Sequence, residues 1–205
     1  MGDIEQYQPL TKKDKISVVL YRLGIGLSSV FIGTLALIST LGPGEDIQNI
    51  IVSGKVTYPG LLLSGLFLSV GLSVFFIHLY VSSFHRVLKR LYFLAFAGFL
   101  YLLLLGDGNP AVAVLSNWFG PLLLLPLAGC LGFITAKEAF CFKLLEGYLL
   151  ALAMPVYLVL AGAGMLSSVP AIACIDVIAV TLFFFTLRKV FMPLHYDIGD
   201  KSAYQ

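Results

Sequence analysis

The sequence predicts an all-α protein, a polytopic bundle of about six transmembrane helices with both termini on the cytoplasmic side. Of the 205 residues, 59% are hydrophobic and only 12% are charged, and the mean hydropathy is +0.96. Soluble domains carry about 25% charged residues, so this chain lacks the polar surface to cover itself in water. The composition and the net charge of +2 exclude a soluble enzyme, a disordered tail and a nucleic-acid-binding protein.

Six apolar runs are long enough to cross a bilayer, which takes about 20 residues of helix. The expected spans are residues 16–41, 58–81, 87–105, 111–136, 144–166 and 170–187. The runs are continuously apolar rather than alternating, which disfavours a membrane β-barrel. Pro121 and Pro126 interrupt the fourth run, so residues 111–118 are either a separate interfacial piece or part of one kinked helix.

Basic residues fix the expected orientation. Six spans place 12 of the 13 Lys and Arg residues on the side of the termini and leave Lys55 alone on the other. Because Lys and Arg concentrate in cytoplasmic loops, we expect both termini inside. The chain then divides into a polar cytoplasmic segment (1–15), a six-helix transmembrane domain (16–187) and a cytoplasmic tail (188–205).

Small residues in the first two spans predict a close helix pair, because helices in lipid associate through small side chains. The second span carries a four-residue repeat of them, and the first carries two pairs at the same spacing. They are Gly65, Ser69 and Ser73 in the second span, and Gly24 with Ser28 and Ser29 with Gly33 in the first.

Asp176 is the acidic residue expected deepest in the membrane, six residues or about 9 Å past Pro170. Acids inside a span are costly and often functional. Asp176 is therefore a candidate ion or proton site. The alternative is a snorkelled or hydrogen-bonded acid near Lys55.

Three other polar residues near span ends have simpler interpretations. Arg22, about one turn inside the first span, is expected to snorkel to the cytoplasmic surface. His78 and His85 lie seven residues apart and could ligate haem, chlorophyll or a metal. Two histidines without a cluster of Cys or carboxylates more simply indicate a solvated interface.

The cytoplasmic segments hold the distinctive polar motifs. Residues 137–142 read KEAFCF, and the end of the chain contains DIGDKS at 197–202. We expect Glu138 to pair with Arg86 or Arg90 of the neighbouring inner loop. The candidate interaction residues are Lys137, Glu138, Phe140, Cys141, Asp197, Gly199, Asp200 and Lys201.

These motifs resemble the DUF2301 family of uncharacterised bacterial integral membrane proteins. The resemblance extends to IHLY and FHR within 77–86 and to YRLG at 21–24. The resemblance implies a multi-pass membrane domain and carries no established activity, catalytic residue or cofactor. It implies the bacterial cytoplasmic (inner) membrane, or the thylakoid membrane if the source is a cyanobacterium. Asp176 is not part of the motifs that carry it.

The leading hypothesis is an interaction or assembly component that docks a membrane or cytoplasmic protein partner on its inner face. The alternative is a small-solute or ion transporter that uses Asp176 and the proline-interrupted helices. No nucleophile, P-loop or dinucleotide motif stands in the chain, so we expect no enzyme, no cofactor and no metal site. A pigment or haem binder using His78 and His85 is a distant third hypothesis. The lipid bilayer is the one partner that the composition requires.

Overall fold

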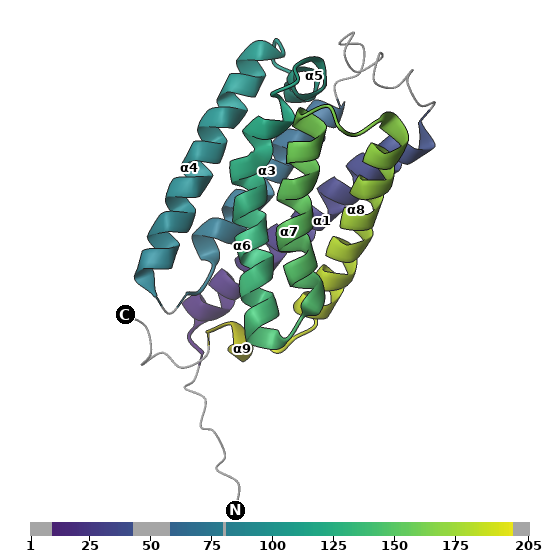
Figure 1. Cartoon of the computed structure of the whole chain (residues 1–205). Coiled ribbons are helices and arrows are strands. Elements are labelled where there is room, and N and C mark those ends of the chain that lie inside the picture. The colour runs from purple at the N-terminus through teal and green to yellow at the C-terminus, as the bar shows by residue number, and fades with distance from the viewer. Residues whose placement is uncertain (1–9, 43–57, 80, 199–205) are drawn as a thin grey trace, which may run out of the picture.

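Six long helices run alternately up and down in the computed structural model of the protein (Figure 1). The structure describes residues 10–42, 58–79 and 81–198. The long helices are α1 (Lys12–Leu41), α3 (Tyr58–Phe76), α4 (Ser82–Leu105), α6 (Leu125–Phe142), α7 (Leu145–Gly162) and α8 (Ser168–Val190). Three short elements accompany them, α5 (Pro110–Ser116), the 3₁₀ helix η1 (Pro121–Leu124) and α9 (His195–Ile198).

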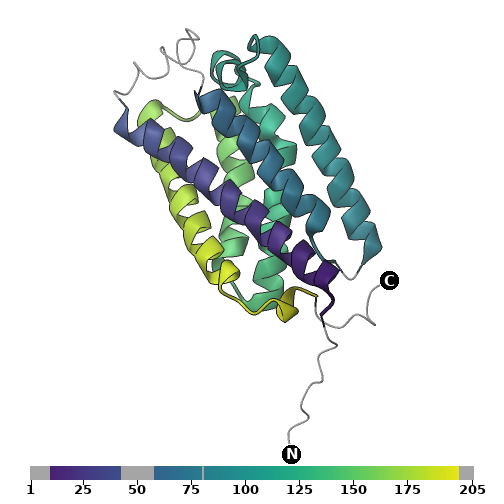
Figure 2. The ribbon, with the colours of Figure 1, turned by 180° about the vertical axis from the view of Figure 1, so that it is seen from behind.

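The helices form two layers. In Figure 1, α6 and α7 pack side by side in front. Seen from behind in Figure 2, α1 crosses the bundle obliquely between α3 and α8 and contacts both. Helix α4 closes the side against α3 and α6, and α8 closes the other side against α1 and α7.

The predicted all-α bundle of about six spans is confirmed. Within the described residues, six helical segments are long and apolar enough to span a membrane, and no strand occurs. Many large apolar side chains point outward along these helices, among them Leu104, Leu152 and Val177. A bundle that is apolar both inside and outside is suited to lipid.

Helix boundaries differ from the prediction by a few residues at most ends. Helix α1 starts at Lys12 because Thr11 and Asp14 form a capping box, with Thr11 N donating to Asp14 Oδ2 (2.9 Å). The last residues of the predicted polar segment are therefore helical. Helix α3 stops at Phe76, α4 begins at Ser82, and α8 continues to Val190 instead of ending at 187.

The fourth predicted span is broken. Residues 110–116 form the separate helix α5, and the span itself starts at Pro121. Pro121 has no N–H to donate, and a Cβ on Gly120 would lie 2.6 Å from Val114 Cα. The chain folds back on α5 at this point, which one continuous helix could not do.

The predicted contact between the first two spans is confirmed as the α1–α3 interface. Ser28 Oγ lies 2.8 Å from Ser69 Oγ, and Ser73 Oγ donates to Tyr21 O (3.1 Å). The second small pair of α1 contributes less, since nothing lies near the Cβ position of Gly33.

One end of the bundle, called here the basic end, is where α1, α4 and α7 begin and where α3, α6 and α8 finish. Every described Lys and Arg lies on or next to these termini. They are Lys12, Lys13, Lys15, Arg22, Arg86, Lys89, Arg90, Lys137, Lys143, Arg188 and Lys189. The short helix α5 lies at the opposite end (Figure 1).

Candidate functional site

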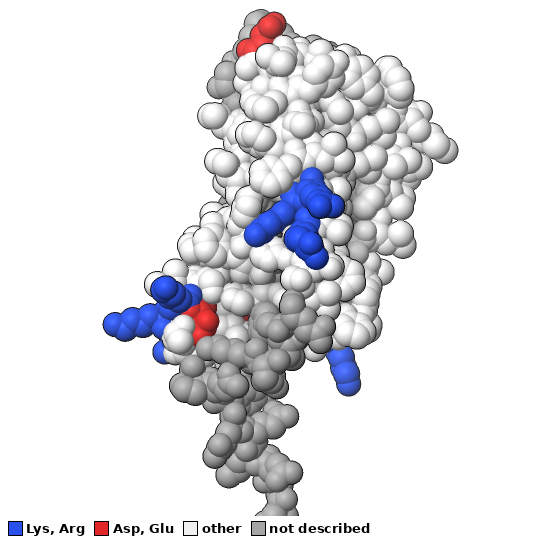
Figure 3. Space-filling model, turned by 90° about the vertical axis from the view of Figure 1, so that its left-hand side faces the viewer, with Lys and Arg blue, Asp and Glu red and all other residues white. Residues whose placement is uncertain are grey.

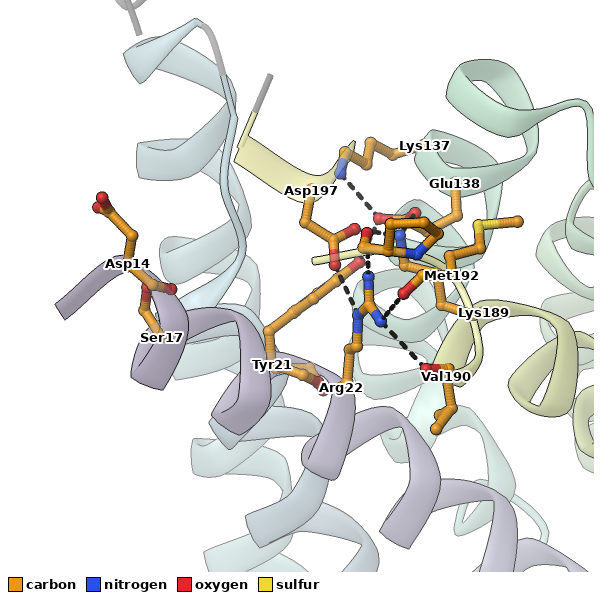
Figure 4. A network of polar contacts seen from close by, with 12 residues as sticks. Asp14, Ser17, Tyr21, Arg22, Lys137, Glu138, Lys189, Val190, Met192 and Asp197 are labelled. Carbon is orange, nitrogen blue, oxygen red and sulfur yellow. Dashed lines mark hydrogen bonds and ion pairs between the residues drawn. The ribbon is translucent and has the colours of Figure 1, made fainter. Parts of the chain in front are cut away.

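Five charged side chains and one tyrosine gather inside the bundle at the basic end, and we call this set the ion cluster (Figure 4). Its members are Tyr21 and Arg22 of α1, Lys137 and Glu138 of α6, Lys189 of α8 and Asp197 of α9. The side chains of Glu138 and Lys189 are 0% exposed. Charges buried to this degree occur in proteins when they are paired.

Glu138 is the acidic centre of the α6 side of the cluster. Its Oε1 accepts hydrogen bonds from Tyr21 Oη (2.6 Å) and Lys137 Nζ (2.7 Å). Its Oε2 lies 2.5 Å from Lys189 Nζ. Two hydrogen bonds and one ion pair from three helices thus converge on one carboxylate, which ties α1, α6 and α8 together at the same end of the bundle.

Asp197 is the second carboxylate and comes from the tail. Arg22 Nε donates to its Oδ2 (2.7 Å), and Lys189 Nζ donates to its Oδ1. Lys189 therefore bridges both acids. Pro193 stands between α8 and α9, where a helix cannot continue through it, and the turn brings Asp197 back under the bundle.

Arg22 also holds the backbone of the tail. Its two terminal nitrogens donate to the carbonyl oxygens of Val190 (3.0 Å), Met192 and Pro193 (3.0 Å). The Val190 carbonyl belongs to the last turn of α8, where carbonyls lack partners within the helix, and the other two follow it; Pro193 O also accepts from Tyr196 N (3.4 Å). One guanidinium thus satisfies the end of α8 and fixes the path of the tail.

The cluster carries one more positive than negative charge, with three cations against two carboxylates. Part of the excess is stabilised by aromatic rings, since Lys189 Nζ lies 4.1 Å from the centroid of Phe142 and Lys137 Nζ 5.7 Å from that of Tyr21. Lys137 is also partly accessible, with a side chain that is 15% exposed.

Two predictions at this end are wrong. Arg22 does not snorkel to the surface; it is buried, because the tail folds over it and supplies its acceptors. Glu138 pairs with Lys137 and Lys189 rather than with Arg86 or Arg90. Glu138 faces the α1–α8 side of the bundle, whereas the two arginines lie on the exposed side of α4.

The other predicted interaction residues fall into two groups. Phe140 and Cys141, at the end of α6, are exposed, with Phe140 79% accessible. Gly199, Asp200 and Lys201 lie outside the described residues. Of the four predicted interaction residues in the KEAFCF motif, Lys137 and Glu138 therefore belong to the ion cluster, and Phe140 and Cys141 lie at the surface.

Asp176 lies at the far end of the bundle from the ion cluster, half-buried on α8. Both carboxylate oxygens accept from Thr40 Oγ1 of α1, at 2.9 and 2.8 Å. This is the hydrogen-bonded arrangement anticipated as the alternative to an ion site, although the partner is Thr40. Lys55 lies outside the described residues.

His78 lies between α3 and α4, His85 lies in the first turn of α4, and the two histidines make separate contacts. His78 Nε2 lies 3.2 Å from Ser17 Oγ, and His85 Nε2 lies 3.2 Å from Val74 O. Burial lowers the pKa of His78, and the nearby charge of Lys137 lowers this pKa further. Within the described ranges, no group of three His, Cys, Asp or Glu side chains is placed to hold a metal ion.

The chain is similar to proteins whose roles are themselves undetermined. Residues 72–205 match the family model described as "Uncharacterized integral membrane protein (DUF2301)". A Haemophilus influenzae protein described as uncharacterized is 28% identical over 207 residues, covering 100% of this chain and 99% of that protein. No solved structure matches the chain. The matched residues include α4 through α9, and so three of the four helices that supply the ion cluster. The chain belongs to the DUF2301 family of integral membrane proteins.

Proposed function

We propose that this integral membrane protein is an assembly component that docks a protein partner at its basic end. The observation that supports this most is that exposed side chains project from a helix end that the ion cluster holds in place. The ion cluster ties α1, α6, α8 and the tail together, while Phe140 and Cys141 project from the end of α6.

The docking surface comprises the exposed residues around the α6–α7 turn and the start of the tail. Phe140 is 79% and Phe191 82% exposed, and they come from segments joined through the cluster. Lys143, in the turn, has a left-handed backbone (φ 56°). A non-glycine residue in that conformation is uncommon and held by its surroundings. Glu138 and Asp197 act from inside, by positioning this surface rather than by touching the partner.

Site-specific photo-crosslinking in native membranes tests the proposal. A photoreactive phenylalanine analogue replaces Phe140 or Phe191, and a control replaces Phe184, an exposed residue of α8. We expect a discrete protein adduct from positions 140 and 191 and lipid adducts alone from 184. Lipid adducts alone from all three positions would remove the docking role.

Transport is the second candidate, and it rests on Asp176. Its carboxylate bridges α1 and α8 through Thr40, and within the described residues no cation pairs with it. Such an acid can exchange a proton or bind a cation. The role predicts that Asp176→Asn abolishes pH-dependent flux in proteoliposomes.

Asp107→Asn is a matched control for this measurement. Asp107 is an exposed acid in the turn between α4 and α5, and its left-handed backbone (φ 48°) is one that Asn also adopts. Flux lost in Asp176→Asn and retained in the control supports transport. Equal flux in both variants and the unmodified protein excludes Asp176 from any transport step.

A further inference from the structure

A groove between α3 and α4 opens on the lipid-facing surface, separate from the ion cluster. It has a volume of about 490 Å³. Its walls are Leu68, Gly71, Leu72, Phe75, Phe76 and Tyr92. Leu68 at its rim is 71% exposed, so the groove is accessible from the membrane.

Gly71 and Tyr92 shape the floor of this groove. A Cβ on residue 71 would lie 2.5 Å from Tyr92 Cζ, so the ring can lie flat against α3 only because residue 71 is glycine. Tyr92 Oη donates to Phe67 O (3.0 Å). The one polar group among the wall side chains is therefore satisfied within the protein, and the groove presents carbon to its occupant.

Three basic residues lie on the first turns of α4, between the groove residue Tyr92 and the start of the helix at the basic end. Arg86, Lys89 and Arg90 are spaced three and four apart, so they share one side of the helix. Lys89 Nζ lies 5.7 Å from the ring centroid of Phe75, which lines the groove. Figure 3, which faces α4, shows one group of basic side chains surrounded by uncharged surface, while the acidic side chains in this view lie beside a second basic group and at the opposite end.

Among the described residues, these charges have no acidic partner. Neither α3 nor α4 contains an Asp or Glu. No ion pair within the described part of the chain includes Arg86, Lys89 or Arg90. The basic cluster at the start of α1 differs, because Asp14 stands among Lys12, Lys13 and Lys15.

We propose that this face binds one anionic phospholipid, with its phosphate at Arg86, Lys89 and Arg90 and an acyl chain in the groove. An apolar groove lies next to cations that make no ion pair within the described residues. These two features match the acyl chain and the phosphate of such a lipid. Basic pockets between transmembrane helices bind anionic headgroups in this way. A protein partner would have to supply acidic side chains for these cations, and a neutral lipid would supply no negative charge at all.

Native mass spectrometry of the full chain in detergent tests the proposal, with phosphatidylglycerol and phosphatidylcholine as probes. We expect the unmodified protein to retain phosphatidylglycerol at least about tenfold more strongly than phosphatidylcholine. Changing Arg86, Lys89 and Arg90 together to Gln removes that preference. Changing Lys12, Lys13 and Lys15 to Gln removes the same charge from the same end and leaves the preference intact.

Two further arms test the groove and exclude other occupants. Leu68→Trp, at an exposed rim position, narrows the groove without changing charge and is expected to weaken phosphatidylglycerol binding. Glycerol phosphate, which has the headgroup chemistry without the chains, is expected to compete poorly. Equal loss in both triple variants, full competition by glycerol phosphate, or a protein adduct from a photo-crosslinker at position 68 would each overturn the proposal.

Discussion

Glu138 and Lys137 are neighbours in sequence with opposite charge and different access to water, and this makes them a matched pair. Replacing a buried acid leaves its cations without a counter-ion, a change that costs about 3–5 kcal/mol. Glu138→Gln leaves three cations of the ion cluster facing Asp197 alone. Lys137→Gln instead removes the excess positive charge from a side chain that reaches water.

We therefore expect Glu138→Gln to lower the free energy of unfolding by about 3–5 kcal/mol. We expect Lys137→Gln to lower it less, because two cations then face two carboxylates. Thermal unfolding of both variants in the same detergent measures the difference. Similar melting temperatures for the two would show that the stability of the cluster depends on Glu138 no more than on Lys137.

His78 is expected to make stability depend on pH. Because burial lowers its pKa in the folded protein, the unfolded chain takes up the proton first as the pH falls. The stability due to neutral His78 is fully present above the unfolded pKa of about 6.5 and is lost as the pH falls through the folded value. The melting temperature should drop between neutral and mildly acidic pH.

His78→Gln should flatten this part of the pH profile, since Gln keeps a hydrogen-bonding group for Ser17 without titrating. His195→Gln, a change at the histidine of α9, serves as the control. An identical acid-induced drop in the His78→Gln variant and the unmodified protein would assign the pH dependence to another group.

At the scale of elements, Gly24 decides how closely α1 approaches α3. A Cβ there would collide with Ser73 Oγ and lie 2.6 Å from Ser69 O, a backbone atom that cannot move alone. Gly24→Ala should force the helices apart and destabilise the protein by about 1–3 kcal/mol. Thermal unfolding checks this.

Gly26→Ala is the control on the same helix, because nothing lies within 4 Å of its Cβ position. Alanine favours a helix over glycine by up to about 1 kcal/mol, so this variant should be neutral or more stable. If both substitutions stabilise the protein, the close α1–α3 contact does not limit stability.

The helices and their first contact could be predicted because each depends on local sequence. Lipid acts on every span separately, so apolar length alone located all six, and small residues at a spacing of four located the α1–α3 face. The break before Pro121 was visible in the prolines, although the fold-back at Gly120 depends on its contact with Val114.

The ion cluster could not be predicted because it depends on how four elements meet. The expected end of the last span at 187 left Lys189 outside the membrane domain, whereas α8 continues to Val190 and turns this residue inward. Arg22 has the local appearance of a snorkelling residue. Its true partners are tail carbonyls that are 168 to 171 residues away in sequence. An arginine just inside a span is the one sequence signal from which a folded-back tail could have been inferred.

For the molecule as a whole, the basic end predicts how the bundle is oriented across the membrane. All described Lys and Arg residues lie there, and such residues favour the cytoplasmic side. Cys141 is an exposed natural label at this end, whereas Cys130 is buried. A variant that keeps Cys141 and carries Cys130→Ala and Cys174→Ala reports the orientation of the bundle.

A membrane-impermeant maleimide should label Cys141 in inverted vesicles and leave it unlabelled in intact cells. Asp107→Cys in a chain otherwise free of cysteine is the control, because residue 107 is exposed beyond the last turn of α4 at the opposite end. It should react in intact cells. The reverse pattern would place the basic end outside. Because the proposed phospholipid site on α4 and the docking surface around Phe140 share that end, the lipid site would then lie in the outer leaflet and the docking surface on the outer face.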